Sequence, residues 1–216
     1  MLHAEPNKKG HVMKPAYFAA WAAVIALLGP GSVALGHDVN HQGRPPVQAD
    51  ASHVPVQIID RPVLDQDGVA HSFGQDVVGN RLVVVNFIYT SCGTLCPLQS
   101  AILADLQDKL GDRLGRDVAL ISLSVDPVVD QPARLHEQAE RFGAKPGWRF
   151  LTGKPRDIEA ILTGMQAWVE TPEDHPGFFL VGAADQRDWS KPDGMPSPDQ
   201  LMQKINAATR LRLDRR

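Results

Sequence analysis

Two long apolar runs, each followed by a helix-like segment, constrain the fold of this chain more than any other feature. Residues 82–89 read Leu-Val-Val-Val-Asn-Phe-Ile-Tyr, and residues 118–125 read Val-Ala-Leu-Ile-Ser-Leu-Ser-Val. Runs of this kind are typical of strands that are buried on both faces of a sheet. Helices are predicted over Pro97 to Leu110, Asp130 to Arg141, and Pro155 to Trp168. Strands that alternate with helices predict an α/β fold whose sheet is parallel in part.

The remaining segments extend this pattern toward both ends of the domain. Short strands are predicted around Val56 to Ile58, Val63 to Val69, and Trp148 to Leu151. Residues 178–181 and the segment around Trp189 predict a hairpin, after which Ser197 to Gln200 has the pattern of a capping box that opens a last helix. Two strand–helix units, a hairpin and a terminal helix together predict a thioredoxin-like fold, with a mixed central sheet flanked by helices.

The first 36 residues have the three parts of an export signal. Three lysines precede an apolar stretch over residues 16–28, and small residues near Ala34 suit cleavage before His37. The apolar stretch is short for a membrane-spanning helix, which needs about 20 residues, and an uncleaved anchor is the alternative. The sequence therefore predicts an extracytoplasmic, periplasmic protein that is either soluble after cleavage or tethered to the membrane.

The rest of the chain divides into a leader, one domain and a tail. Residues 37–55 are polar, contain prolines and lack an apolar period, so they predict a flexible leader. The folded domain is expected over residues 56–212, with a basic tail over residues 213–216. The net charge of −3 argues against a nucleic-acid-binding protein, which would be expected to carry a basic surface. The basic stretch 210–216 is interpreted as a solvated helix end.

Cys92 and Cys96, the only cysteines of the chain, follow the first apolar run as Cys-Gly-Thr-Leu-Cys-Pro. This order predicts that they lie in the turn between a strand and the start of a helix, where the helix amides favour thiolate over thiol. A four-residue spacing on a helix separates the two Cα atoms by about 6 Å, which permits a disulfide or one shared metal ion. A purely structural disulfide is the weaker interpretation, because so short a loop stabilises a fold by only about 2 kcal/mol.

Two thiolates suit a soft ion such as Cu(I), and one imidazole would complete a three-coordinate site, whereas zinc would need a fourth ligand. His175 is the candidate for that imidazole, because it lies in a loop that leads into a predicted strand. A loop histidine is still most often only solvated. His71 is interpreted as a surface residue of an early turn, and His136 lies within a predicted helix. The other histidines lie in the export segment or the leader: His3, His11, His37, His41 and His53.

The run from Phe87 to Pro97, with Ser-Val-Asp-Pro at 124–127, Asp130 and then Asp174-His175, resembles the Sco/SenC family. The resemblance implies an exported or membrane-linked thioredoxin-fold protein that serves assembly of the copper-A centre of cytochrome c oxidase. It also implies that Cys92, Cys96 and His175 bind one copper ion, as Cu(I) or Cu(II). Asp126 and Asp174 match acidic positions of the family, and we interpret them as turn and loop carboxylates, since hard carboxylates suit Cu(I) poorly.

The leading hypothesis is therefore a copper metallochaperone rather than an enzyme, whose partners are a copper-receiving protein such as an oxidase subunit and a thiol reductant. The rival is a thiol-disulfide oxidoreductase or redox sensor, in which Cys92 attacks and Cys96 resolves. A thiol peroxidase is a third alternative. Many family members carry Pro-Asp-Val between the cysteines, where this chain has Gly-Thr-Leu, so the recipient and the balance between transfer and reduction stay open. After cleavage, His37 and His41 could also take up Cu(II).

Overall fold

The computed structural model describes residues 53–214, and within them eight strands form one mixed sheet in the order β1-β8-β7-β4-β5-β6-β2-β3. Strands β4, β5 and β6 are parallel, whereas β7 pairs with β4, and β2 with β6, in antiparallel orientation. The strands are β1 His53–Pro55, β2 Pro62–Asp65, β3 Ala70–Ser72, β4 Leu82–Ile88, β5 Val118–Ser124, β6 Trp148–Thr152, β7 Phe179–Ala183 and β8 Asp188–Ser190.

The register of β4 and β5 determines where their loops meet. Leu82 pairs with Val118 at the start of these strands and Ile88 pairs with Ser124 at their end. All seven residues of each strand are buried, as expected for strands that are covered on both faces. The segments that follow β4 and β5 therefore emerge side by side at one edge of the sheet.

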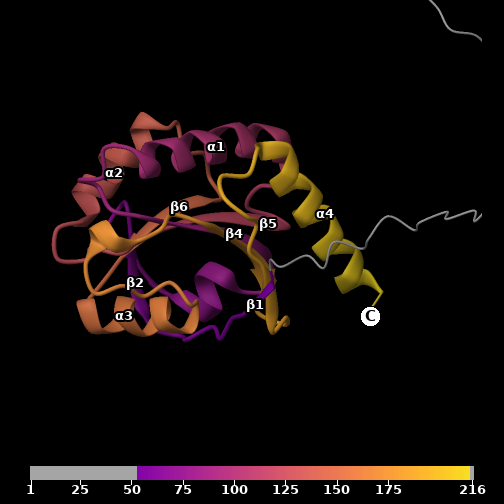
Figure 1. Cartoon of the computed structure of the whole chain (residues 1–216), viewed down its shortest axis with the longest axis horizontal. Coiled ribbons are helices and arrows are strands. Elements are labelled where there is room, and N and C mark those ends of the chain that lie inside the picture. The colour runs from indigo at the N-terminus through magenta and orange to yellow at the C-terminus, as the bar shows by residue number, and fades with distance from the viewer. Residues whose placement is uncertain (1–52, 215–216) are drawn as a thin grey trace, which may run out of the picture. The chain divides into compact units, whose positions relative to one another are not determined.

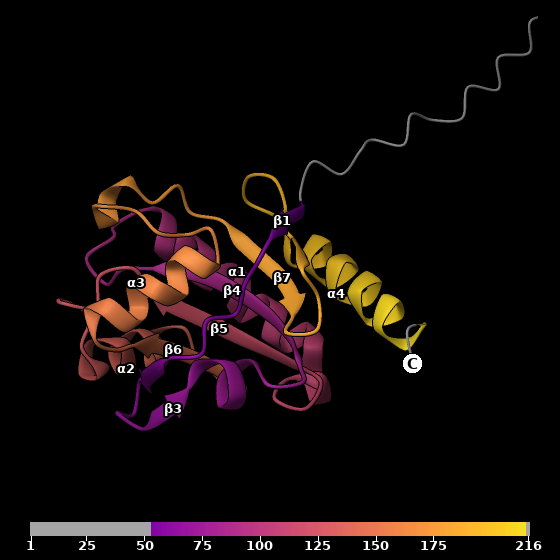
Figure 2. The same ribbon diagram turned by 90° about the horizontal axis from the view of Figure 1, so that it is seen from below.

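Helices cover both faces of the sheet. The α-helices are α1 Leu95–Leu110, α2 Pro132–Arg141, α3 Pro155–Gly164 and α4 Pro198–Leu213. Helices α1, α2 and α4 lie over one face, and α3 lies over the other with a short π-helical segment, Phe73–Val78 (Figures 1 and 2). One apolar cluster fills each space: Leu103 and Leu135 pack toward Val84, while Ile158 and Phe73 belong to the cluster around Ile121. The domain thus has two cores separated by the sheet.

The predicted mixed sheet flanked by helices is confirmed. The two long strands, the hairpin of β7 and β8, and the capping box at Ser197 are all present. Helix α1 begins two residues before the predicted Pro97, and α4 extends to Leu213, one residue into the predicted tail.

Three local predictions were wrong. His53–Pro55, assigned to the leader, form β1 because they pair with β8, whereas residues 56–58 form no strand. Helix α3 ends at Gly164 instead of Trp168, because the Gly164 carbonyl accepts a hydrogen bond from the amide of Gln57 at 2.8 Å and Gln166 adopts a positive φ of 57°. Helix α2 begins at Pro132, after the N-cap Gln131, and not at the predicted Asp130, whose side chain has another role.

Other predictions fall outside the described residues. These are the export signal or anchor over residues 1–36, the leader up to residue 52 with His37 and His41, and the last two residues of the tail. Between residues 53 and 214, no helix is long and apolar enough to cross a membrane.

Candidate metal centre

The two cysteines lie together at the start of α1. Cys92 is in the turn after β4, and Cys96 is the second residue of the helix. The amide of Cys96 donates a hydrogen bond to the Cys92 sulfur at 3.4 Å. Thr94, at the N-cap, makes no side-chain cap bond, so this sulfur accepts from an amide that a capping oxygen would otherwise satisfy. Both cysteines are free thiols, and Cys92 is the more exposed.

The two thiols have opposite acidities. Burial tends to raise the pKa of Cys92, but hydrogen bonds from the Cys96 thiol, from the amides of Cys96 and Thr94, and from the Tyr89 hydroxyl outweigh it and lower that pKa to about 7. Burial, followed by the hydrogen bond to Cys92, raises the pKa of Cys96 to about 12. The same region holds one accessible thiolate near neutral pH and one protonated thiol, as expected for a nucleophilic pair at a helix start.

A buried carboxylate holds the turn that carries Cys92. Asp130 is fully buried and accepts hydrogen bonds from the Thr90 amide at 3.0 Å, the Thr90 hydroxyl at 2.6 Å and the Ser124 hydroxyl at 2.6 Å. The Ser124 hydroxyl in turn accepts from the amide of Asp126 at 3.0 Å. Asp130 therefore ties the loop after β4 to the loop after β5. Sequence reasoning missed this role, although the adjacent ends of two parallel strands were a signal for it.

His175 lies at the same edge of the sheet as the cysteines. It precedes β7, which begins there because Phe179 pairs with Asn86 near the end of β4. The residue is 7% exposed, and its imidazole packs against the rings of Phe87 and Phe178, with each centroid at 5.2 Å from its own. The backbone turns after His175 at Gly177, whose φ of +62° lies in the left-handed region that favours glycine. The sequence prediction of a loop position is correct, but this histidine is buried rather than solvated.

One nitrogen of this imidazole has no partner. The amide of Gly177 donates to Nδ1 of His175 at 3.2 Å, so Nδ1 is assigned as the acceptor. The other nitrogen, Nε2, is buried and makes no hydrogen bond within the described part of the chain. Burial, and then the positive charge of Lys191, lower the pKa of His175 to about 4. The ring is therefore neutral at pH 7, the state in which imidazole binds metals.

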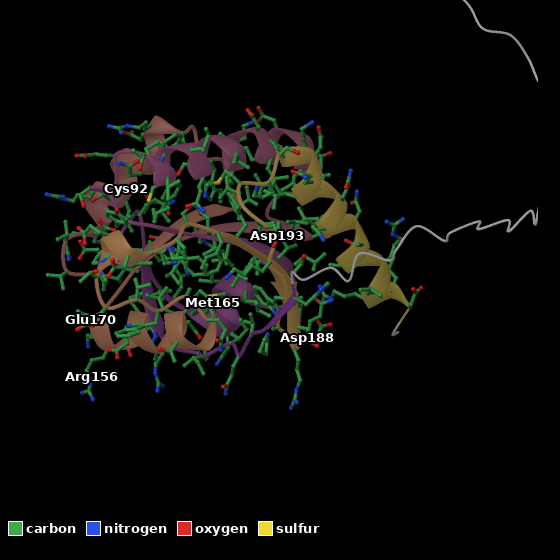
Figure 3. All side chains as sticks on the ribbon, in the orientation of Figure 1. Cys92, Arg156, Met165, Glu170, Asp188 and Asp193 are labelled. Atoms are coloured by element: carbon green, nitrogen blue, oxygen red, sulfur yellow. The ribbon has the colours of Figure 1, made fainter. Side chains whose placement is uncertain are left out.

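The three predicted ligands are not yet assembled. Across residues 53–214, no three His, Cys, Asp or Glu side chains lie close enough to hold one metal ion. The structure brings the cysteine pair together and places His175 at the same edge, but in its own apolar pocket. Figure 3 shows Cys92 at this end of the domain, with Glu170 of the segment before His175 at the same end.

Comparison with known proteins identifies the family. The SCO1/SenC family matches residues 63–210, which is more than half of the chain. The chain belongs to the SCO1/SenC family. A relative from Bacillus subtilis, the SCO1 protein homolog, is 34% identical over 137 residues, which are 58% of this chain and 70% of the relative. The SenC protein of Rhodobacter capsulatus is 33% identical over 93 residues, covering 42% of this chain and 41% of that protein.

Solved structures of SCO1/SenC proteins share the fold. BsSco, described as a cytochrome c oxidase assembly protein with a disulfide switch, is 29% identical with a TM-score of 0.58, over 73% of this chain and 96% of BsSco. ScoI from Bradyrhizobium japonicum with copper bound is 24% identical with a TM-score of 0.57, over 69% of this chain and 99% of ScoI. The second likeness shows the fold alone.

Asp126 and Asp174, which match acidic positions of the family, make hydrogen bonds within a turn and a loop. The backbone carbonyl of Asp126 closes the turn after β5 by accepting from the amides of Val129 at 3.1 Å and Asp130 at 2.8 Å, and its carboxylate also accepts from the Val129 amide at 3.4 Å. A carboxylate oxygen of Asp174 accepts from the Thr171 hydroxyl at 2.5 Å within the loop before His175. Both residues stabilise loops that carry or flank the site.

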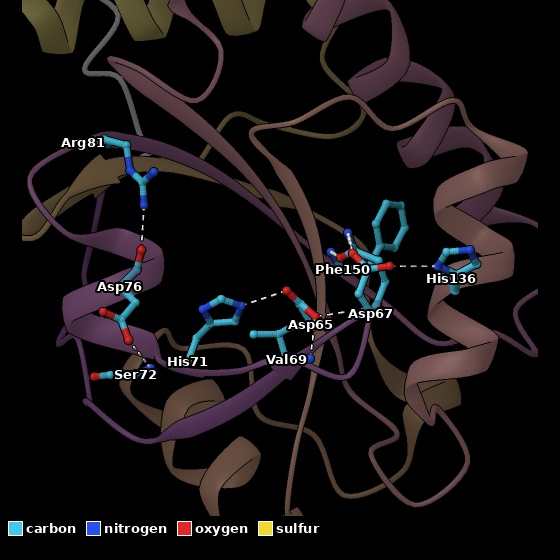
Figure 4. A network of polar contacts seen from close by, with 10 residues as sticks. Asp65, Asp67, Val69, His71, Ser72, Asp76, Arg81, His136 and Phe150 are labelled. Carbon is cyan, nitrogen blue, oxygen red and sulfur yellow. Dashed lines mark hydrogen bonds and ion pairs between the residues drawn. The ribbon is translucent and has the colours of Figure 1, made fainter.

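Two other histidines belong to a network of polar contacts around β2, β3 and α2 (Figure 4). His71 is not the surface residue of a turn that we predicted. It is in β3, its side chain is 16% exposed, and its Nε2 lies 2.7 Å from Asp65. Burial tends to raise the pKa of Asp65, but hydrogen bonds from His71 and from two backbone amides outweigh this effect and lower that pKa. His136 contacts Asp67 at 3.1 Å on the surface, so this network fastens the β2–β3 turn to α2.

Proposed function

We propose that this chain is an extracytoplasmic copper metallochaperone that holds one copper ion through Cys92, Cys96 and His175 and passes it to a copper enzyme. The single observation that carries the proposal is the unpartnered, buried Nε2 of a neutral His175 at the same sheet edge as a reactive thiol pair. A buried polar atom without a partner is rare and calls for an explanation, which a ligand role supplies.

The donor set supports copper over other metals. Two sulfur ligands and one imidazole match Cu(I), and the imidazole also accommodates Cu(II), whereas zinc sites of this kind take four ligands. Membership of the SCO1/SenC family, whose relatives include proteins with copper bound and a cytochrome c oxidase assembly protein, points to the same ion. We therefore assign an oxidase subunit with a copper-A centre as the recipient class.

Binding requires a local rearrangement. In the present conformation Nδ1 of His175 accepts from Gly177, so the imidazole proton is on Nε2. Copper at Nε2 requires that proton to move to Nδ1, where the Gly177 amide would then face another donor. The segment over residues 172–177, which contains a short 3-10 turn and the positive-φ glycine, must shift to bring the ring to the thiols. The cysteines would capture the ion first and His175 would complete the site.

Transfer then proceeds by ligand exchange. The partly exposed Cys92 is the ligand that a recipient thiolate reaches first, and Cys96, which is 9% exposed, is released later. Copper keeps its oxidation state, so the step consumes no electrons, and the protons that the recipient thiols give up on binding copper are available to the released sulfurs. A disulfide between the two cysteines would block it, and a thiol reductant must keep the pair reduced.

Copper titration of the reduced full chain under anaerobic conditions tests this assignment. The parent should bind one copper per chain, and Cys92→Ser and Cys96→Ser should lose tight binding. His175→Ala should weaken binding at least about 10-fold, since even the loss of an outer-shell partner costs about this much and His175 is proposed as a direct ligand. His136→Ala is the matched control, because this surface histidine lies in the Asp67 network. Unchanged affinity in Cys92→Ser would contradict the proposal.

A thiol-disulfide oxidoreductase is the second candidate, and the opposite acidities of the two thiols favour it. In this reaction the Cys92 thiolate attacks a partner disulfide, Cys96 resolves the mixed disulfide, and the chain is oxidised while the partner gains two thiols. His175→Ala separates the two functions. It should leave reduction of a disulfide-bonded recipient peptide intact, while a metallochaperone loses copper affinity in the same variant.

The extracytoplasmic location is part of the proposal and is supported by the amino-terminal sequence pattern alone. Cell fractionation with detection of the mature amino terminus tests it. Recovery outside the cytoplasm with His37 as the first residue would support export with cleavage. Recovery in the membrane with the first 36 residues retained would support the anchor, and a cytoplasmic location would contradict both.

A further inference from the structure

Four arginines line one cavity at the edge of the sheet opposite the thiols. The cavity has a volume of about 550 Å³ and lies against Leu82 at the start of β4 and Asp117 just before β5. The last turns of α4 form its other wall, so the carboxyl end of α4 and the Cys92 turn lie at opposite ends of the domain (Figures 1 and 3). The four residues are Arg113, Arg116, Arg210 and Arg212.

Two of these guanidinium groups are held in position by neutral acceptors. Arg113 donates from Nη1 to Asn206 at 2.9 Å and from Nη2 to Thr209 at 3.2 Å. Arg212 donates from Nη2 to the Asn80 carbonyl at 3.0 Å, and its side chain is only 16% exposed. A guanidinium has five N–H donors, so each of these groups retains donors that the described contacts do not use. Their orientation is fixed before any ligand arrives.

The charges in the cavity are only partly balanced. Arg116 pairs with Asp117 at 3.1 Å, and Arg212 pairs with Asp185 at 3.1 Å. The hydrogen bonds of Arg113 go to neutral groups, although its charge also interacts with Asp117. The side chain of Arg210 makes no hydrogen bond or ion pair with any residue between 53 and 214. Four guanidinium groups therefore face two carboxylates, Asp117 and Asp185, which leaves an excess of positive charge at the cavity. Arginine forks match the oxygen geometry of phosphate and bind it bidentately.

We propose that this cavity binds a phosphate group, supplied either by the headgroup of an anionic lipid or by a free phosphate ester. The purely structural alternative, in which the arginines only fasten α4 to the sheet, explains the bonds of Arg113 and Arg212. That alternative explains neither the Arg210 side chain, which has no partner among residues 53–214, nor the open cavity that the four arginines line. Leu213 lines the cavity and is 63% exposed, which suits a ligand with an apolar part. The assignment is independent of copper binding.

Calorimetric titration of the full chain with inorganic phosphate gives the first test. We expect a Kd of about 1 mM or tighter, weakened about 10-fold in Arg113→Gln and about 3-fold in Arg210→Gln. The side chain of Arg210 makes no hydrogen bond with residues 53–214, so Arg210→Gln should fold normally and still tests the proposal if Arg113→Gln folds poorly. Arg141→Gln, an exposed arginine of α2, should match the parent. Copper stoichiometry should be the same in all four proteins.

Co-sedimentation with vesicles distinguishes the source of the phosphate. If a lipid headgroup is the ligand, the parent should sediment with phosphatidylglycerol vesicles more than Arg113→Gln and Arg210→Gln do, with no difference on phosphatidylcholine. If a free phosphate ester is the ligand, only the calorimetric difference should appear. Phosphate heats and vesicle binding that are the same in the parent and both variants would overturn the proposal.

Discussion

Asp130→Ala should destabilise the reduced protein and loosen the turn that carries Cys92. The substitution removes one buried carboxylate and leaves three donors without their acceptor: the Thr90 amide, the Thr90 hydroxyl and the Ser124 hydroxyl. Hydrogen bonds to a carboxylate contribute about 1.5–3 kcal/mol each, but the sum overestimates the loss, since the half-buried Thr90 groups regain water. We expect a loss of about 3 kcal/mol in the free energy of unfolding.

Urea denaturation of the reduced protein measures this loss. With a slope of about 2 kcal/mol per molar urea, the midpoint of Asp130→Ala should fall by about 1.5 M. Asp130→Asn should cost only about 1 kcal/mol, because its amide oxygen still accepts from Thr90 and the Ser124 hydroxyl can accept from the amide nitrogen. Asp126→Ala is the matched control, since that carboxylate accepts one long bond of 3.4 Å. A midpoint for Asp130→Ala within about 0.3 M of the parent would refute this reasoning.

Other parts of the fold predict separate outcomes. Alkylation of the reduced protein should accelerate through pH 7, because folding lowers the pKa of Cys92 and only its thiolate reacts, while Cys96 stays protonated; a midpoint near pH 9 would contradict this. Ser197→Ala should lower the free energy of unfolding by about 1 kcal/mol in thermal denaturation through loss of the capping box; an unchanged melting temperature would argue against it. Gly182→Ala should cost about 3 kcal/mol, because the added methyl overlaps the buried Trp189 ring, and wild-type stability would be inconsistent with that packing.

The central fold could be predicted because its signals are local. The seven buried residues of β4 and of β5 stand in continuous apolar runs, and the capping box of α4 lies within four residues of sequence. By contrast, β1 has three residues and forms only because β8 is beside it. Such a strand carries no periodicity of its own, so its existence depends on a tertiary contact that no sequence window contains.

Of the candidate site, only the cysteine pair and the loop position of His175 could be predicted from the sequence. The cysteine pair was evident from its place after a buried run, and the loop position of His175 was correct. The burial of His175 was not evident, because it depends on Phe87, which is far away in sequence. Asp130 has the residue type of an N-cap and lies one residue before the N-cap Gln131, yet its carboxylate binds Thr90, forty residues earlier. A local rule for helix starts cannot anticipate that a side chain turns inward to a neighbouring loop.

X-ray absorption spectroscopy of the copper-loaded full chain tests the central claim most directly. We predict a copper shell of two sulfur atoms and one nitrogen in the parent, and loss of the nitrogen with both sulfurs retained in His175→Ala. His71→Ala, which removes the partly buried histidine of the Asp65 network, should give the spectrum of the parent. A nitrogen shell that persists in His175→Ala, or a shell without two sulfurs in the parent, would contradict the proposed ligands.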